Sequence, residues 1–204
     1  MSRNTGWDAY WHATGMLTRF MDRCRSILAR ELFGYFVQQA GRNGRRLATL
    51  EAGSGSATVS ALMARRDWFC VALDIEPVAL QAARGVSDDV RLVQGDLFTP
   101  CFHAGSFDLV WNNSTLEHFA DPLAALQRMA ALTRPGGRVF AGVPYTFGPL
   151  CVFKLQRRSF GGTWDGTTFS GRALELLFRR AGLEIVGRRL FFCRCFVGVM
   201  GKKA

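Results

Sequence analysis

The sequence is poor in lysine and histidine, and it contains no apolar run of the ~18 residues that a membrane-spanning helix requires. Its basic residues are almost all arginine, because lysine occurs only at Lys154, Lys202 and Lys203. The cysteines form no Cys-x-x-Cys pair, and the histidines are too few to complete a set of zinc ligands, so the sequence does not predict a zinc site. The polar and aromatic start of the chain lacks the pattern of a secretory signal peptide. We therefore expect a cytoplasmic protein with reduced thiols and no bound metal.

The composition indicates a globular protein with a strong positive charge. The 204 residues are a length typical of one domain, and 49% of them are hydrophobic. The net charge of +10 favours association with anions. Nucleic acid, an anionic lipid surface and an acidic substrate would each fit, and a solvated basic surface would have the same composition. Charge alone therefore leaves the partner open.

The stretch from Leu47 to Ala57 carries the clearest functional pattern. It predicts a short apolar strand that ends at an acid, Glu51, followed by a tight glycine turn and a helix that begins at Ser56 or Ala57. Such a turn lets backbone N–H groups approach a ligand closely, and the acid suits an ammonium group. S-adenosylmethionine is a ligand that needs both features.

The glycine spacing leaves two other interpretations open. A nicotinamide-binding turn requires Gly-x-Gly-x-x-Gly, and the third position here holds the β-branched Thr58. The spacing acid-x-Gly-x-Gly-x-Gly fits better, with Gly53, Gly55 and, in the last place, Ala57, the smallest substitute for glycine. A structural turn that binds nothing would show the same residues.

Alternating helix and strand patterns predict an α/β fold. Helical periodicity is present at residues 17–37, 56–66, 77–84, 122–132 and 170–181. Strand patterns are present at residues 47–51, 69–74, 90–93, 107–111, 138–143, 183–192 and 195–200. This order is typical of a doubly wound, mostly parallel sheet with helices on both faces. The strands then end at one edge, where such sheets bind ligands, and we expect Asp74, Asp96 and Asn112 there.

The chain is expected to form one domain, 1–204, in four parts. Residues 1–45 would form a helical cap, 46–143 the ligand-binding core, 144–169 a loop or lid on the substrate side, and 170–204 a helix and a terminal hairpin. Two strands so close in sequence favour an antiparallel pair at the edge of the sheet. A loop as long as 144–169 usually carries function or disorder.

Five short motifs in this order resemble the class I S-adenosylmethionine-dependent methyltransferases, in particular the small-molecule group that includes ubiquinone and menaquinone biosynthesis enzymes. The motifs are Leu50-Glu51-Ala52-Gly53-Ser54-Gly55, Leu73-Asp74-Ile75, Gln94-Gly95-Asp96-Leu97, Phe107-Asp108-Leu109-Val110 with Leu116-Glu117-His118, and Leu132-Thr133-Arg134-Pro135-Gly136-Gly137. The resemblance spans roughly residues 47–200. It implies a Rossmann-like, seven-stranded sheet whose last strand is antiparallel, with S-adenosylmethionine as the cofactor.

The resemblance assigns the methionine and ribose portions of the cofactor to the first motifs. It implies that Glu51 orients the methionine ammonium group, through water. Gly53, Ser54 and Gly55 would pass along the methionine and the ribose, and Asp74 would accept hydrogen bonds from the ribose hydroxyls. For Asp74 the alternative is a purely structural role in a turn or helix cap.

The resemblance also implies contacts to the adenine. Ile75 would pack on the ring, Asp96 would accept from its amino group, and Leu97 would offer a backbone N–H. Asn112 lies where the family places a backbone carbonyl near the methionine amino group. Asp108 opens its strand instead of ending it, so we interpret it as structural.

The acceptor side is less specific. His118 is the best candidate for a base, because it follows the fourth strand and can exchange a proton near neutral pH. The occurrence of the Leu-Glu-His triplet in the family with many different substrates slightly favours a packing role instead. Tyr10 and Trp11 in the aromatic leader, and Tyr145 after the fifth strand, are candidates to line the acceptor pocket or to pack. Together with the aromatic 144–169 segment they predict a small apolar or aromatic acceptor.

Several alternatives to a soluble small acceptor remain open. A membrane lipid or quinone would suit basic and aromatic loops at an anionic surface. A nucleic-acid acceptor ranks lower, because residues 112–115 lack the Asn/Asp-Pro-Pro-aromatic motif of amino-methylating DNA enzymes. A non-catalytic cofactor-binding protein and a nicotinamide-dependent oxidoreductase are the alternatives from other classes. The oligomeric state is not indicated.

Overall fold

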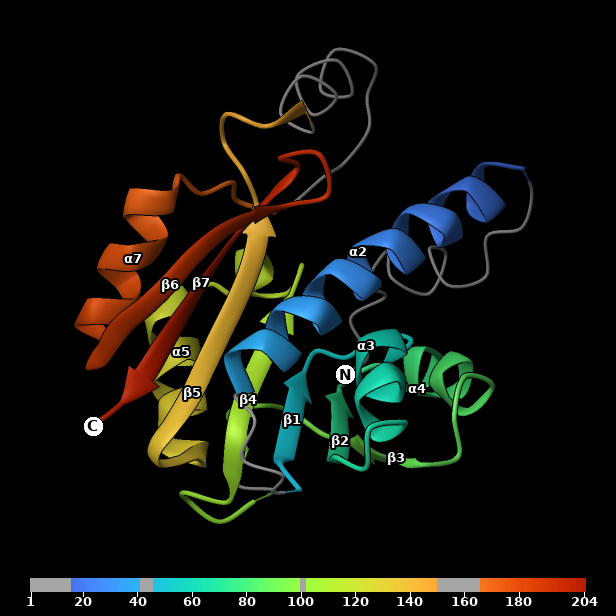
Figure 1. Cartoon of the computed structure of the whole chain (residues 1–204), viewed down its shortest axis with the longest axis horizontal. Coiled ribbons are helices and arrows are strands. Elements are labelled where there is room, and N and C mark those ends of the chain that lie inside the picture. The colour runs from blue at the N-terminus through green and yellow to red at the C-terminus, as the bar shows by residue number, and fades with distance from the viewer. Residues whose placement is uncertain (1–15, 41–45, 100–101, 150–165) are drawn as a thin grey trace.

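The computed structural model describes residues 16–40, 46–99, 102–149 and 166–204 (Figure 1). Its centre is a seven-stranded sheet in the order β3-β2-β1-β4-β5-β7-β6. Neighbouring strands are parallel from β3 to β5, and β7 pairs antiparallel with both β5 and β6. The strands are β1 Ala48–Ala52, β2 Phe69–Asp74, β3 Val90–Gln94, β4 Phe107–Asn113, β5 Thr133–Pro144, β6 Leu183–Phe191 and β7 Phe196–Lys203.

Helices cover both faces of this sheet (Figure 1). One face packs against α2 Met16–Ala40, α3 Thr58–Ala64 and α4 Pro77–Arg84. The other packs against α5 Pro122–Leu132, α7 Gly171–Arg180 and the short 3-10 helix η1 Leu116–His118. Strands buried on both faces explain the near-continuous apolar runs in the sequence. The doubly wound fold with an antiparallel last strand is therefore confirmed.

Aromatic packing joins α2 to the middle of the sheet. The Phe36 ring meets the Phe140 ring edge-on with centroids 4.9 Å apart, and lies 5.1 Å from the Trp111 ring. All three side chains are fully buried. Edge-to-face pairs of this kind add to the free energy gained from burial. The buried face of α2 thus belongs to the core that supports β4 and β5.

Two of the differences from the expected element boundaries involve turns. The helix after the glycine turn begins at Thr58, later than Ser56 or Ala57, because Ala57 is its N-cap with φ of 50°. Strand β5 begins at Thr133, before the Arg134-Pro135-Gly136-Gly137 turn, since a register shift against β4 lets the strand pass through it. The division of 1–204 into a cap, core, lid and hairpin stays a prediction.

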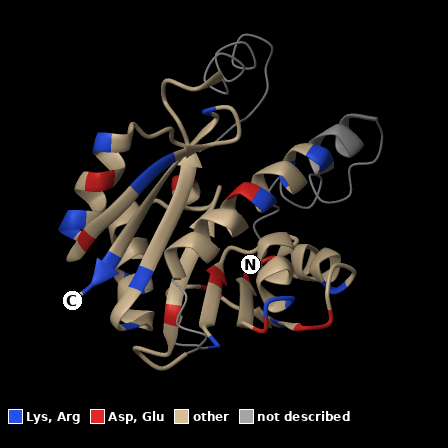
Figure 2. Cartoon of the chain, viewed as in Figure 1, with Lys and Arg blue, Asp and Glu red and all other residues tan. Residues whose placement is uncertain are grey.

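Charge is distributed unevenly over the structure (Figure 2). Residues 122–204 contain fourteen Lys and Arg against three Asp and Glu, so this part of the chain carries the positive excess. Exposed members lie on α7, β6 and β7: Arg172, Arg179, Arg180, Arg188, Arg189 and Lys202. Among the residues described, no helix is both long and apolar enough to cross a membrane.

Asp108 has the structural role that we expected of it. Its Oδ2 accepts a hydrogen bond from the backbone N of Ala48 at 2.8 Å, and its Oδ1 pairs with Arg134 Nε. The carboxylate therefore ties the start of β4 to the starts of β1 and β5, at the edge of the sheet opposite the strand carboxyl ends.

We expect Asp108→Ala to lower the free energy of unfolding by about 2 kcal/mol, because it leaves the Ala48 N–H without its acceptor. Asp108→Asn keeps an acceptor for that N–H and should lose less. Urea denaturation of both variants measures the difference. Equal losses would contradict the role given to the Ala48 bond.

Candidate functional site

The carboxyl ends of β1, β2, β3 and β4 lie along one edge of the sheet, at the top of the strand arrows in Figure 1. These ends are Ala52, Asp74, Gln94 and Asn113. The glycine turn follows β1 directly at this edge. The structure therefore brings together the residues that we expected at the end of each strand.

Three backbone N–H groups of the glycine turn donate hydrogen bonds to the end of strand β2. The N–H groups of Gly53 and Ser54 both donate to the Leu73 carbonyl, at 2.8 and 3.0 Å. The N–H of Gly55 donates to Asp74 Oδ2 at 2.7 Å. The turn is thus bonded to the end of the neighbouring strand, and Asp74 positions it.

Asp74 combines a structural role with remaining capacity to bind. Its second oxygen, Oδ1, accepts from the backbone N of Glu76 at 3.0 Å. Each carboxylate oxygen can accept more than one hydrogen bond, and the residue is only half-buried. The expected ribose contact and the structural alternative are therefore compatible.

Ala57 stands where the family pattern has its third glycine. It is buried and adopts a φ of 50°, in the left-handed region that favours glycine. A Cβ in this region costs roughly 1 kcal/mol. The backbone conformation at position 57 therefore favours glycine, in addition to any need for a small side chain.

Thr115 is a residue of this site that sequence reasoning missed. Its Oγ1 donates to the Gly53 carbonyl at 3.1 Å, and it also reaches the Asn113 carbonyl at 3.3 Å. A Cβ on Gly53, whose φ is 76°, would overlap Thr115 Cγ2 and lie 2.7 Å from Oγ1. Thr115 therefore joins the turn after β1 to the end of β4, and it requires glycine at position 53.

Glu51 lies almost completely buried on β1, facing α3. Its Oε2 accepts a hydrogen bond from Ser60 Oγ at 2.5 Å. Burial raises the pKa of the Glu51 carboxyl to about 8, with a smaller upward contribution from the Asp74 charge, while the Ser60 bond opposes the rise. At neutral pH the carboxyl of the ligand-free protein is therefore mostly protonated.

Exposed apolar side chains lie at the ends of β2 and β3. Ile75 is 60% exposed and Phe98 is 45% exposed, with the Phe98 ring edge-on to Phe119 at 5.6 Å. Leu97 is buried, and the exposed Asp96 uses its Oδ1 to accept from the Phe98 backbone N at 3.0 Å. The exposed Ile75 and Phe98 side chains offer a surface on which a flat apolar group can pack.

Asn112 points its side chain away from this edge. It is fully buried, and its Nδ2 donates to Met129 Sδ of α5 at 3.4 Å. Only its backbone is placed to serve the role that the resemblance implies. The amide of the next residue, Asn113, donates from Nδ2 to Ser114 Oγ at 3.0 Å, and its Oδ1 lies against Gly142 of β5.

Two buried polar atoms, one in the turn and one at the end of β4, have no hydrogen-bond partner among the residues described. They are Ser54 Oγ and Asn113 Oδ1. Buried polar atoms are nearly always paired in folded proteins, so a polar ligand at this edge would complete both. Together with the buried Glu51 and the exposed Ile75, they fit a cofactor that combines an amino group, hydroxyls and a flat ring.

The candidates on the acceptor side lie beyond β4 and β5. The His118 side chain is 27% exposed, and its Nε2 lies 3.9 Å from Oε1 of the buried Glu117. Tyr145 packs edge-on against Phe147 at 5.6 Å, and its backbone N donates to the Cys195 carbonyl. Tyr10 and Trp11 lie outside the described residues.

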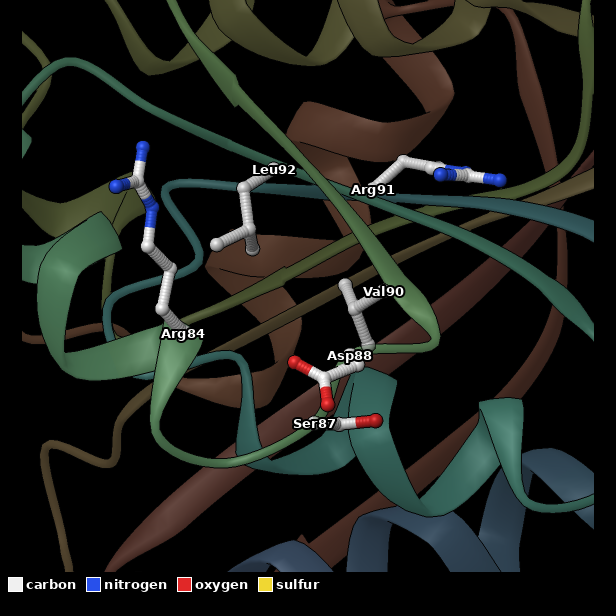
Figure 3. Close-up of a pocket in the computed structure, with 6 residues that line it drawn as sticks. All are labelled: Arg84, Ser87, Asp88, Val90, Arg91 and Leu92. Atoms are coloured by element: carbon white, nitrogen blue, oxygen red, sulfur yellow. The ribbon is translucent and has the colours of Figure 1, made fainter.

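Two hollows on the surface of the described part of the chain lie away from this edge. One, of about 340 Å³, lies between the end of α4 and the start of β3 and is lined by Arg84, Ser87, Asp88, Val90, Arg91 and Leu92 (Figure 3). Its two arginines point away from each other (Figure 3), so they do not converge on an anion. The second, of about 200 Å³, adjoins the Asp108–Arg134 pair at the opposite end of the strands. Within the described parts of the chain, no group of three or more His, Cys, Asp or Glu could hold a metal ion.

Comparison with known proteins agrees with this geometry. A family model described as a methyltransferase domain matches residues 50–141. The ubiquinone biosynthesis O-methyltransferase of Aromatoleum aromaticum is 32% identical over 161 residues, covering 72% of this chain and 67% of that protein. The demethylmenaquinone methyltransferase of Mycobacterium sp. (strain KMS) is 41% identical over 96 residues, covering 47% of this chain and 40% of that protein.

A solved structure shares the fold over nearly the whole chain. Magnesium protoporphyrin IX methyltransferase from Synechocystis, solved with bound S-adenosylhomocysteine, superposes with a TM-score of 0.77 at 16% identity, covering 98% of this chain and 95% of that one. The match to the Aromatoleum protein is extensive enough to decide the family. The chain belongs to the class I S-adenosylmethionine-dependent methyltransferases.

Proposed function

We propose that this enzyme transfers the methyl group of S-adenosylmethionine to a small apolar or aromatic acceptor at the carboxyl edge of its sheet. The observation that carries the proposal is the glycine turn bonded to Asp74, beside the buried Glu51 and the exposed Ile75. The similarity to ubiquinone and menaquinone biosynthesis methyltransferases supports an acceptor with a substituted aromatic ring.

The residues at this edge would divide the cofactor between them. Glu51 would face the methionine amino group, Gly53 to Gly55 would run along the methionine and ribose, and Asp74 would accept from the ribose hydroxyls. Ile75 would pack on the adenine, Asp96 would accept from its amino group, and Leu97 would offer a backbone N–H. The backbone carbonyl of Asn112 would lie near the methionine amino group.

The bound cofactor supplies a methyl group on a positively charged sulfur, which is a reactive centre without further activation. The protein must align the acceptor with that methyl group and exclude water, and alignment can account for a large part of the rate. Tyr145, which follows β5, would form part of the acceptor wall. Tyr10 and Trp11 are proposed for the same wall from the sequence alone.

His118 is the proposed base for an acceptor whose proton must leave. The buried Glu117 carboxyl, 3.9 Å from Nε2, would stabilise the imidazolium that forms. We expect His118→Gln to lower kcat by about a hundredfold while leaving the affinity for S-adenosylhomocysteine unchanged. The exposed His103, between β3 and β4, provides the control His103→Gln, which should retain full kcat. An unchanged kcat and pH profile in His118→Gln would contradict the assignment.

A membrane-bound lipid or quinone acceptor is the second candidate, and one surface favours it. On α7, Leu176 is 57% exposed, and its neighbours at helical spacing are the exposed Arg172, Arg179 and Arg180. Each arginine lies three or four positions from Leu176, and residues at this spacing share a helix face. The arginines therefore surround the apolar Leu176 side chain. Arginines near an anionic membrane contribute about 1 kcal/mol each to binding. On this proposal the protein is cytoplasmic and peripheral to the membrane.

Radiolabelled methyl transfer tests the acceptor class. Purified protein is incubated with methyl-labelled S-adenosylmethionine and a cell extract, and lipid, aqueous small-molecule and RNA fractions are then separated. Label in the lipid or the small-molecule fraction supports the proposal and distinguishes its two forms. Label in RNA would replace it with the nucleic-acid alternative, and binding without transfer to any fraction would indicate a non-catalytic protein.

A further inference from the structure

Glu51 and Ser60 form a buried polar pair between β1 and α3. Ser60 is fully buried, and its hydroxyl lies 2.5 Å from Glu51 Oε2. Glu51 itself has only 6% of its surface exposed. Carboxylates are rarely buried so completely without a cationic partner, and among the described residues no Lys or Arg forms a salt bridge with it.

Burial outweighs the hydrogen bonds that Ser60 offers to a negatively charged Glu51 in the ligand-free protein. On β2, Asp74 adds a second negative charge, and the thiol of Cys70 has a pKa raised by burial and by Glu51 itself. On β4, Trp111 lies beside Glu51 in register, and from α3 the neutral Ser60 offers its hydroxyl and its backbone N–H to the carboxyl. The environment therefore favours a neutral carboxyl until a cation arrives.

We propose that Glu51 and Ser60 form a proton-coupled seat for the cofactor amino group, in which Glu51 holds a proton in the free protein and gives it up to solvent when the ammonium group binds. The inference rests on the proposed function. In the binding step the Glu51 O–H bond breaks, its proton passes to buffer, and the carboxylate left behind faces the ammonium group. Charge balances, because one positive charge enters the protein as another leaves.

Ser60 is the positioning residue of this pair. A hydroxyl accepts a hydrogen bond from a protonated carboxyl and donates one to a carboxylate, so Ser60 remains bonded to Glu51 before and after the proton leaves. Its donation favours the ionised form and therefore lowers the penalty of releasing the proton. Loss of the hydroxyl should weaken cofactor binding through Glu51, without any contact between Ser60 and the cofactor.

Calorimetric titration with S-adenosylhomocysteine in phosphate and in Tris tests the proposal, because the two buffers differ in ionisation enthalpy. At pH 7 we expect release of roughly 0.9 proton per ligand bound, and at pH 9 roughly 0.1, since a carboxyl with a pKa of about 8 changes from mostly protonated to mostly ionised over this range. Methylthioadenosine keeps the adenosine and the sulfur but lacks the amino acid. It should bind without releasing this proton.

Two variants assign the proton to the pair. Glu51→Gln should abolish the release while keeping the side-chain volume. Ser60→Ala should still release a proton at pH 7, continue to release it at pH 9, and bind about tenfold more weakly at pH 7, which corresponds to an upward pKa shift of one unit. Circular dichroism establishes that both variants fold.

The outcomes separate this inference from the proposed function. Binding of S-adenosylhomocysteine with no proton exchanged at pH 7, or with release unchanged in Glu51→Gln, would overturn the inference and leave the cofactor site intact. Failure of the wild-type protein to bind S-adenosylhomocysteine would overturn the proposed function itself.

Discussion

Replacing Asp74 with alanine is expected to lower the affinity for S-adenosylhomocysteine by about a hundredfold. The variant loses the acceptor for the ribose hydroxyls, and it also releases the Gly55 N–H, which donates to Asp74 Oδ2 at 2.7 Å. Two charge-assisted hydrogen bonds worth roughly 1.5 kcal/mol each account for a loss of this size. Isothermal titration of the wild type and the variant measures it directly.

Asp121 provides a matched control for this loss. It is also an aspartate that accepts from a backbone N–H, that of Ala124 at 3.0 Å, at the start of α5. Asp121→Ala should lower the free energy of unfolding by about 1 kcal/mol and leave ligand affinity unchanged. If Asp74→Ala binds S-adenosylhomocysteine as tightly as Asp121→Ala does, the cofactor site has been assigned to the wrong residues.

Gly53→Ala is expected to lower the free energy of unfolding by about 3 kcal/mol, the second large effect. Part of this loss comes from placing a Cβ at a φ of 76° and part from its overlap with Thr115, each contributing roughly 1–2 kcal/mol. Since the turn would have to move away from β4, ligand affinity should fall as well. Thermal or urea denaturation, together with calorimetric binding, measures both losses.

The variant Gly182→Ala distinguishes the backbone contribution from the overlap with Thr115. The φ of Gly182 is 78°, nearly equal to that of Gly53, but a Cβ there would meet nothing within 4 Å. Gly182→Ala should therefore lose only the backbone contribution, about 1 kcal/mol. The Gly53→Ala/Thr115→Ala double variant should recover part of the stability that Gly53→Ala loses through the overlap. Equal destabilisation by Gly53→Ala and Gly182→Ala would show that Thr115 does not constrain the turn.

The strands and their common edge could be predicted because each of the parallel strands is a short apolar run that ends at or just before a polar residue. Asp74 and Gln94 illustrate this, since they are the last residues of β2 and β3. The antiparallel hairpin was predictable from the short spacing between β6 and β7. Strand β5 was predicted too short, because a Pro-Gly-Gly sequence resembles a turn when the neighbouring β4 that pairs with it is not known.

The contacts that close the site could not be predicted, because they join residues that are far apart in the sequence. Thr115 meets Gly53 across 62 positions, and no local pattern marks either as the partner of the other. Ser60 lay within a predicted helix, but its contact with Glu51 depends on which face of that helix covers β1. The only signal in the sequence for the left-handed backbone of Ala57 is that the family pattern has a glycine at this position.

A crystal structure of the protein with S-adenosylhomocysteine tests the central claim most directly. We expect the ligand over the glycine turn, with its ribose hydroxyls on Asp74, its amino group facing Glu51 and its adenine against Ile75. We also expect Ser54 Oγ or Asn113 Oδ1 to acquire a hydrogen-bond partner. Ligand in the hollow lined by Arg84 and Arg91, with the strand edge left unchanged, would contradict the claim.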